Sequence, residues 1–314
     1  MLIGDPSDQS GKRQPSLPAA DLAGELAEAR AANARLSEEY EDLKLLYEAM
    51  IEHGEAVEDQ LAESNLTLQA AQARLEAELS DAARYVMSIL PEPRTATPIT
   101  EWLLVPSTEL GGDSFGYHAI DDDHMAFYLL DVCGHGVGAA LLSVTVINVL
   151  RAAALPNVDF RDPSRLLAAL NDAFPMEKQN NMFFTIWYGV YRRSSSELRY
   201  ATGGHPPAIH LKSAADGTTA ASELITLGGM AIGALPGVEY ECKSVHVEPG
   251  DRLLILSDGT FEVNGPDGDM LSVSELAAFA ADHSDSPRAI LEWVRSFNSE
   301  GPLPDDFSLL HVGF

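Results

Sequence analysis

Residues 21–84 carry a continuous heptad pattern, and this feature constrains the fold of the chain more than any other. The stretch contains no proline and is rich in alanine, glutamate and leucine. Apolar residues recur at alternating spacings of three and four over about nine heptads, which is the signature of a coiled coil. One seam position holds Leu22, Ala29, Leu36, Leu43, Met50, Val57, Ser64, Ala71 and Glu78, and the other holds Leu26, Asn33, Tyr40, Tyr47, Gly54, Leu61, Leu68, Leu75 and Ala82. The pattern predicts one long helix.

Such a helix needs a partner to bury its apolar stripe. We predict a parallel homodimer; the alternative is a single amphipathic helix packed on the rest of the chain. The stretch holds 16 acidic and five basic residues, so paired helices would meet some repulsion. Asn33 falls at an a position, where it either fixes register and oligomeric state or simply interrupts the stripe. We assign residues 20–90 to a regulatory and dimerisation segment, and predict that the polar residues 1–19 before it are disordered.

Pro91, Pro93 and Pro98 end the helical pattern, and the period of the sequence changes after them. Short apolar runs then alternate with amphipathic stretches, and residues 192–197 form a short link that favours a hairpin. Strands are predicted at 101–105, 125–132, 184–191, 198–201, 208–211, 252–256 and 307–312, and helices at 138–154, 164–174, 273–282 and 286–298. We therefore predict an α+β domain at 98–314, an antiparallel β-sandwich flanked by helices and preceded by the coiled-coil helix.

Composition excludes several classes of protein. The 314-residue chain has a formal net charge of −28, which argues against a nucleic-acid partner and against attraction to anionic membranes. No apolar run approaches the ~20 residues that span a bilayer. The two cysteines, Cys133 and Cys242, lie far apart in no metal-binding spacing and suit a reducing compartment. These features predict a soluble cytoplasmic protein.

Four aspartate motifs lie at glycine-marked turns or at the ends of predicted strands. Asp113 follows two glycines, Asp131 and Asp258 end apolar runs, and Asp305 and Asp306 are adjacent. Carboxylates that end separate strands can gather at one edge of a sheet, where without a cation they would repel one another. A hard divalent ion such as Mg²⁺ or Mn²⁺ resolves this repulsion, because it prefers oxygen ligands. The sequence thus predicts a carboxylate-lined, metal-dependent site.

A dinucleotide-binding loop is an alternative interpretation of residues 134–139, which match the spacing G-x-G-x-x-A. Asp131 would crowd a pyrophosphate with like charge, and the next predicted element is a helix rather than the second strand of a βαβ unit. We therefore set this interpretation aside.

Six motifs in one order resemble the bacterial, SpoIIE/RsbU-type branch of the metal-dependent protein phosphatases, relatives of protein phosphatase 2C. They are Gly-Gly-Asp at 111–113, Asp-Val-Cys-Gly-His-Gly at 131–136, Gly-Gly-His-Pro-Pro at 203–207, Pro-Gly-Asp at 249–251, Ser-Asp-Gly at 257–259 and Asp-Asp-Phe-Ser at 305–308. The resemblance covers about residues 98–314 and implies hydrolysis of phosphoserine or phosphothreonine by metal-activated water.

The resemblance also implies roles for individual residues. It assigns Asp131 as the carboxylate that bridges two Mn²⁺ or Mg²⁺ ions, with the Val132 carbonyl beside it. Asp258 and Asp305 match further ligands, and Asp113 matches a ligand that binds directly or through water. The expected supporting residues are Gly112, His135 and Asp306.

His135 has two possible roles, as a general acid towards the leaving serine oxygen or as a stabiliser of its turn. Cys133 has no basic cluster to activate it and is expected to be a small buried residue, and His205 is expected to be structural.

The resemblance predicts a protein serine/threonine phosphatase acting on a STAS-type anti-anti-sigma protein in a partner-switching pathway. It leaves the upstream sensor unidentified. A change in the packing of the helical segment would then alter the metal site. The alternatives are a catalytically inactive scaffold or regulator with this fold, and a metallohydrolase acting on small phosphoesters.

Overall fold

The computed structural model describes residues 19–108, 110–214, 218–224, 229–265, 269–283, 285–297 and 303–314. The chain divides into two compact units, Met1–Arg74 and Leu75–Phe314. The disorder predicted for residues 1–19 falls outside the described residues, except at Ala19, where the first helix begins. Within the described ranges, no helix has both the length and the apolar character needed to cross a membrane.

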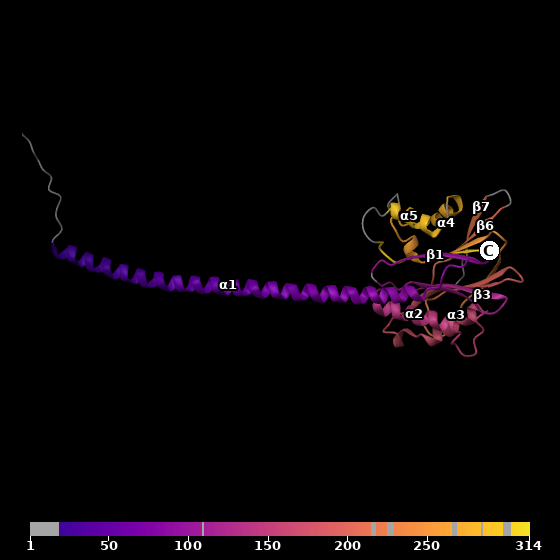
Figure 1. The fold of residues 1–314 in the computed structure, drawn as a ribbon, viewed down its shortest axis with the longest axis horizontal. Helices are drawn as coiled ribbons and strands as arrows, with labels where there is room; N and C mark the ends of the chain where they lie inside the picture. Colours follow the sequence, from indigo (N-terminus) through magenta and orange to yellow (C-terminus); the bar gives the residue numbers. More distant parts are fainter. Residues whose placement is uncertain are drawn as a thin grey trace, which may run out of the picture. The chain divides into compact units, whose positions relative to one another are not determined.

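The long helix predicted from the heptads is confirmed as α1, Ala19–Ile89 (Figure 1). In the first unit its seam residues are exposed to solvent, among them Leu36 and Leu43. The helix ends where the prolines predict, since Pro91 follows its last residue by two positions.

The last turns of α1 belong to the second unit. Hydrogen bonds to backbone carbonyls at the end of the helix and just after it attach this segment to the rest of the unit. Arg151 donates to the carbonyl of Ile89 at 2.8 Å, and the Trp102 indole donates to that of Pro91 at 2.9 Å. The Tyr117 hydroxyl donates to the carbonyl of Glu92 at 2.6 Å. Helix α1 therefore runs directly into the second unit without an intervening loop.

Two antiparallel five-stranded sheets form the centre of the second unit. Sheet A has the order β1-β10-β9-β6-β7 and sheet B the order β2-β3-β4-β5-β8. The strands are β1 (Ile99–Val105), β2 (Ser114–Ala119), β3 (His124–Val132), β4 (Phe184–Arg192), β5 (Glu197–Gly203), β6 (Ala208–Ser213), β7 (Thr219–Leu224), β8 (Lys243–His246), β9 (Arg252–Leu256) and β10 (Phe307–Gly313). The predicted hairpin at 192–197 is confirmed, because Arg192 pairs with Glu197.

Helices cover the outer face of each sheet (Figure 1). Sheet B carries α2 (Val137–Arg151) and α3 (Pro163–Ala173), and sheet A carries α4 (Val273–Asp282) and α5 (Pro287–Phe297); η1 (Met176–Lys178) and η2 (Asp258–Thr260) are short 3₁₀ turns. Asp162 caps α3 ahead of Pro163, and Ser272 and Glu275 form a capping box at α4, as their residue types favour. The predicted α+β sandwich flanked by helices is confirmed.

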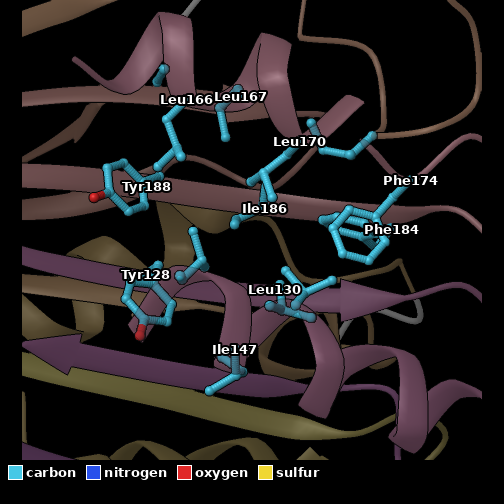
Figure 2. Close-up of a cluster of buried hydrophobic side chains, with 14 of the residues drawn as sticks. Tyr128, Leu130, Ile147, Leu166, Leu167, Leu170, Phe174, Phe184, Ile186 and Tyr188 are labelled. Carbon is cyan, nitrogen blue, oxygen red and sulfur yellow. The ribbon is translucent and has the colours of Figure 1, made fainter. Parts of the chain in front are cut away.

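Strand β3 shows how the layers are made, because its two faces alternate between two cores. Met125, Phe127 and Leu129 are buried between the sheets. Tyr128 and Leu130 face the other way and pack with α2 and α3 (Figure 2). Residues of that outer cluster include Ile147 on α2, Leu166, Leu167 and Leu170 on α3, and Phe184, Ile186 and Tyr188 on β4. Side chains that alternate with a period of two thus bury both faces of β3, one against sheet A and the other against the helices.

The sequence patterns missed three strands, namely β2, β7 and β8. Strand β2 has a glycine at its centre, and a Cβ on Gly116 would lie 2.6 Å from the Tyr128 ring. This close packing requires the glycine that obscures the strand pattern. Strand β8 is only four residues long, and β7 contains few of the β-branched or aromatic residues that mark strands.

Candidate metal centre

The strand ends bring the aspartate motifs to one edge of the sandwich. In sheet B, Asp131 lies at the end of β3 and Asp113 immediately before β2, its antiparallel neighbour. The Val132 amide donates to the Gly112 carbonyl at 3.4 Å, so the two motifs lie side by side. In sheet A, Asp258 follows β9 and Asp305 precedes β10.

Hydrogen bonds made by Ser257 and Ser308 join the two sheet A motifs at this edge. The Ser257 amide donates to the Ser308 carbonyl at 3.0 Å, and the Ser308 amide donates to the Ser257 hydroxyl oxygen at 3.0 Å. The Ser257 hydroxyl in turn donates to the Asp306 carbonyl at 3.0 Å. Asp258 and Asp305 therefore extend from a tightly closed pair of strand ends.

Asp306 connects the two sheets. One oxygen of its buried carboxylate accepts hydrogen bonds from the Ser107 amide at 2.8 Å and the Ser107 hydroxyl at 2.9 Å. The other oxygen lies 3.5 Å from the Asp113 amide nitrogen. Gly111 makes this arrangement possible, because a Cβ at that position would overlap the Asp306 carboxylate. Asp306 thus positions the loop that carries Asp113.

Asp113 is buried beneath this edge, and its Oδ2 atom has no hydrogen-bond partner among the described residues. Burial raises the pKa of Asp113 well above its usual value, and the charges of Asp131 and Asp306 raise it further. Hydrogen bonding by Ser308 and Ser257 only partly offsets this rise in pKa.

The other carboxyls at this edge show the same effects. Burial, followed by the charges of Asp258, Asp305 and Asp306, raises the pKa of Asp131 to about 7. Burial and the charge of Asp305 also raise the pKa of Asp258. The side chains are therefore close enough to destabilise one another's ionised forms.

Comparison with known proteins assigns the family. The sequence profile described as Stage II sporulation protein E (SpoIIE) matches residues 121–314. The chain belongs to the SpoIIE family.

Individual relatives agree with the SpoIIE assignment. Phosphoserine phosphatase RsbU of Bacillus subtilis (strain 168) is 27% identical over 283 residues, covering 86% of this chain and 78% of RsbU. Phosphoserine phosphatase RsbP of the same organism is 25% identical over 187 residues, covering 59% of this chain and 43% of RsbP. The solved SiaA-PP2C domain of Pseudomonas aeruginosa matches with a TM-score of 0.65 at 23% identity, covering 78% of this chain and 98% of that domain. The second unit of this SpoIIE-family chain therefore has the PP2C fold.

The SpoIIE-type carboxylates fit a divalent cation by their chemistry, although they are not arranged as a finished ligand set. Within the part of the chain that the structure describes, no three His, Cys, Asp or Glu side chains already form a metal-binding group. The raised pKa values of Asp113 and Asp131 and the unpartnered Asp113 Oδ2 atom are nevertheless what a cation would relieve.

Gly112 and Val132 form the backbone part of the edge. A Cβ on Gly112 would overlap the Val132 carbonyl oxygen and would lie 3.2 Å from Asp131 Oδ1. Only glycine therefore leaves room for that carbonyl beside the carboxylate.

The histidines and Cys133 of these motifs differ in their surroundings. His135 is exposed between Gly134 and Gly136, and no described residue hydrogen-bonds or pairs with its side chain. Cys133 is half-buried and not fully buried as expected, and its sulfur accepts the Phe183 amide at 3.2 Å.

His205 is buried, and its Nδ1 atom lies 2.8 Å from Thr185 Oγ1. Thr185 is opposite Asp131 in the β3–β4 register. His205 therefore supports, from within the core, the strand beside the candidate metal site. We call the edge that carries Asp113, Asp131, Asp258 and Asp305 the metal edge.

Sequence reasoning missed Glu262 as a neighbour of the site, and it assigned no role to Ser257 and Ser308, although both lie in the motifs at 257–259 and 305–308. The charge of Glu262 raises the pKa of Asp258, and the Glu262 amide donates to the Asp258 carbonyl at 2.8 Å. Its position four residues after Asp258, in a helical turn, could have indicated this proximity. The serine pairing depends on the β9–β10 register, which the sequence alone does not reveal.

Proposed function

We propose that this protein is a Mn²⁺- or Mg²⁺-dependent protein serine/threonine phosphatase. The supporting observation is the convergence of Asp113, Asp131, Asp258 and Asp305 from two sheets on one edge, where the pKa values of Asp113, Asp131 and Asp258 are raised and the buried Asp113 Oδ2 atom has no partner among the described residues. The phosphoserine phosphatases RsbU and RsbP are relatives of this chain.

The four carboxylates and the Val132 carbonyl would hold the two ions that the family resemblance implies. When bound, such ions lower the pKa of water and so supply the nucleophile that attacks phosphorus. The phosphoserine ester then yields serine and inorganic phosphate, and the leaving serine oxygen takes up a proton. Asp306 and Gly111 keep the Asp113 loop in place, while Gly112 keeps the Val132 carbonyl accessible.

The first experiment is hydrolysis of p-nitrophenyl phosphate with added Mn²⁺ and with EDTA. We expect metal-dependent turnover in the wild type and its loss in Asp131→Asn. Asp122→Asn is the matched control, because Asp122 is an exposed aspartate that precedes the other end of β3. Absence of turnover in folded wild type would contradict the proposal and favour the inactive scaffold or regulator; metal-binding calorimetry would then decide whether the site binds ions at all.

For the substrate, we propose a phosphoserine protein, by family resemblance a STAS-type protein of a partner-switching pathway. Support for this step comes from the relatives and not from the site, which explains only phosphate-ester hydrolysis. Comparing phosphate release from a phosphoserine protein and from nucleotides tests it, and preferential hydrolysis of nucleotides would contradict it.

We also propose that α1 forms a parallel homodimer, because its exposed seam has no other described partner in the first unit. Leu43→Glu should convert the dimer to a monomer in light scattering coupled to size-exclusion chromatography. Leu45→Glu is the control, since Leu45 is similarly exposed at 63% but lies outside the seam. A monomeric wild type, or equal effects of the two variants, would contradict the proposed interface.

The last turns of α1 support a regulatory role for this segment. Ala83, Val86 and Leu90 border a cavity of about 20 Å³ that also contacts Gly111 and Asp113. Val86→Lys is expected to change turnover or the Mn²⁺ requirement, whereas Tyr85→Lys, at an exposed position, is not. Equal kinetics of both variants and wild type would contradict this role.

A further inference from the structure

A groove lies beside the metal edge, between α2 and the turn that precedes β4. It has a volume of about 230 Å³. Leu141 and Thr145 line it from α2, and Lys178, Asn180 and Met182 line it from the turn. None of these residues belongs to the metal site described above.

Hydrogen bonds connect the groove to the metal loop. The Cys133 amide donates to the Phe183 carbonyl at 3.0 Å, and the Phe183 amide donates to the Cys133 sulfur at 3.2 Å. Cys133 follows Asp131 by two residues, so the turn that ends at Phe183 is bonded directly to the segment that carries Asp131. The wall of the groove is therefore attached to the segment that carries Asp131.

The turn has a defined shape. Asn180 and Asn181 both have left-handed backbone conformations, with φ of 54° and 60°. Asparagine tolerates this region better than most residues, but two in succession require support. The Asn181 amide donates to the Met176 carbonyl at 2.9 Å, and the Met176 amide donates to the Gly233 carbonyl at 3.0 Å. These bonds hold one wall of the groove in place before anything binds.

The chemistry of the groove is both apolar and cationic. Leu141 is 61% exposed on α2, whereas Leu142, Val146 and Ile147 of the same helix are buried, and Val137 one turn earlier is 45% exposed. Lys178 is exposed, and its side-chain ammonium group makes no hydrogen bond or ion pair with any described residue. The positive charge of Lys178 complements an acidic ligand.

We propose that this groove binds the segment of the phosphoprotein substrate that flanks its phosphoserine. An apolar side chain of that segment packs on Leu141 and Met182, and an acidic side chain pairs with Lys178. The inference rests on the proposed phosphatase function and adds to it a preference for substrate sequence. A second copy of this chain is a poorer occupant, because the turn that forms one wall of the groove is bonded to the segment that carries Asp131.

The test uses the full-length protein and a panel of synthetic phosphoserine peptides. Each peptide carries one glutamate or one leucine at one of the three positions on either side of the phosphoserine, in an otherwise alanine and glutamine background. The readout is kcat/KM for phosphate release. We expect the wild type to prefer glutamate at one position by about fivefold and leucine at another by about tenfold.

Each variant is judged by its preference between peptides, so a general loss of activity cancels. Lys178→Glu should lose the glutamate preference, and Leu141→Ala should lose the leucine preference. Lys212→Glu and Met270→Ala are the matched controls, since both residues are exposed and lie outside the groove. These control variants should keep the wild-type preferences.

The outcomes separate the two proposals. Failure of the wild type to hydrolyse p-nitrophenyl phosphate with Mn²⁺ refutes the phosphatase function, and the docking groove falls with it. Hydrolysis of p-nitrophenyl phosphate with no peptide preference, or with preferences retained in Lys178→Glu and Leu141→Ala, overturns the groove alone.

Discussion

Gly111 is the position at which the smallest substitution should most disturb the metal edge. A Cβ there would overlap the Asp306 carboxylate, with even the farther oxygen, Oδ1, only 2.7 Å away. Gly111→Ala must therefore displace a carboxylate that holds Ser107 by two hydrogen bonds and lies against the Asp113 amide. The expected result is a less stable domain with a misplaced Asp113.

The magnitude follows from the bonds that Asp306 makes. Each hydrogen bond to a charged group contributes about 1.5–3 kcal/mol, so losing both bonds to Ser107 would cost about 3–6 kcal/mol. Relaxation of the neighbouring loop recovers part of this loss, and we expect a decrease of about 3 kcal/mol in the free energy of unfolding. For a domain of this size, that corresponds to a decrease of about 6–12 °C in Tm.

Thermal unfolding and Mn²⁺-dependent hydrolysis of p-nitrophenyl phosphate measure the two effects. Gly138→Ala is the control, because a Cβ there would make only an ordinary contact, 3.7 Å from Met182 Sδ, and alanine is the better helix former. The double variant Gly111→Ala/Asp306→Ala tests the cause. If the Asp306 carboxylate is the obstacle, Gly111→Ala should cost little once that carboxylate is gone. Additive losses, or a Gly111→Ala protein with wild-type Tm and activity, would refute the reasoning.

Three further predictions concern stability. Burial raises the pKa of Asp285, but the hydrogen bond and charge of His311 and the charge of Arg252 outweigh it, and the pKa lies below its usual value. This stabilisation is present above the unfolded carboxyl pKa of about 3.9 and is lost as pH falls through the lower folded pKa. At pH 7, Asp285→Asn should therefore unfold at a lower urea concentration than the wild type. An unfolding midpoint equal to that of the wild type would contradict this. Burial lowers the pKa of His205 to about 3, so the unfolded chain binds a proton below pH ~6.5 that the folded chain does not. Stability should then fall between pH 6.5 and 3, and His205→Gln should flatten this part of the urea-midpoint profile; an unchanged slope would count against it. Ile147→Ala should lower the free energy of unfolding, measured in urea, by about 2–5 kcal/mol because it leaves a cavity in the outer core. A decrease below about 1 kcal/mol would indicate that the neighbouring side chains fill the cavity.

Much of the fold could be predicted because its strongest signals are local. The heptads of α1 and the apolar run that ends at Asp131 need no knowledge of distant residues. The strand that ends before Asp258 is likewise recognisable from five consecutive residues. The order of motifs along the chain then predicted which aspartates would meet, by resemblance rather than by geometry.

What the sequence did not reveal depends on contacts between distant residues. Ser107 and Asp306 are 199 positions apart, and no local pattern marks their hydrogen bonds. Gly116 looks like a turn residue until the Tyr128 ring is placed against it. The groove beside α2 was also missed, because an exposed Leu141 and an unpaired Lys178 become informative only when the chain around them is folded.

The carboxylates of the metal edge are shared between two layers. Asp113 and Asp131 belong to sheet B, whereas Asp258 and Asp305 belong to sheet A. The distance between the pairs is therefore set by the thickness of the core that separates the sheets, which includes Phe127 and Leu310. Ions held between the two pairs would cross-link the layers, so ion affinity and sandwich stability would become one linked equilibrium. Substitutions deep between the sheets can then tune the affinity for metal without altering any ligand.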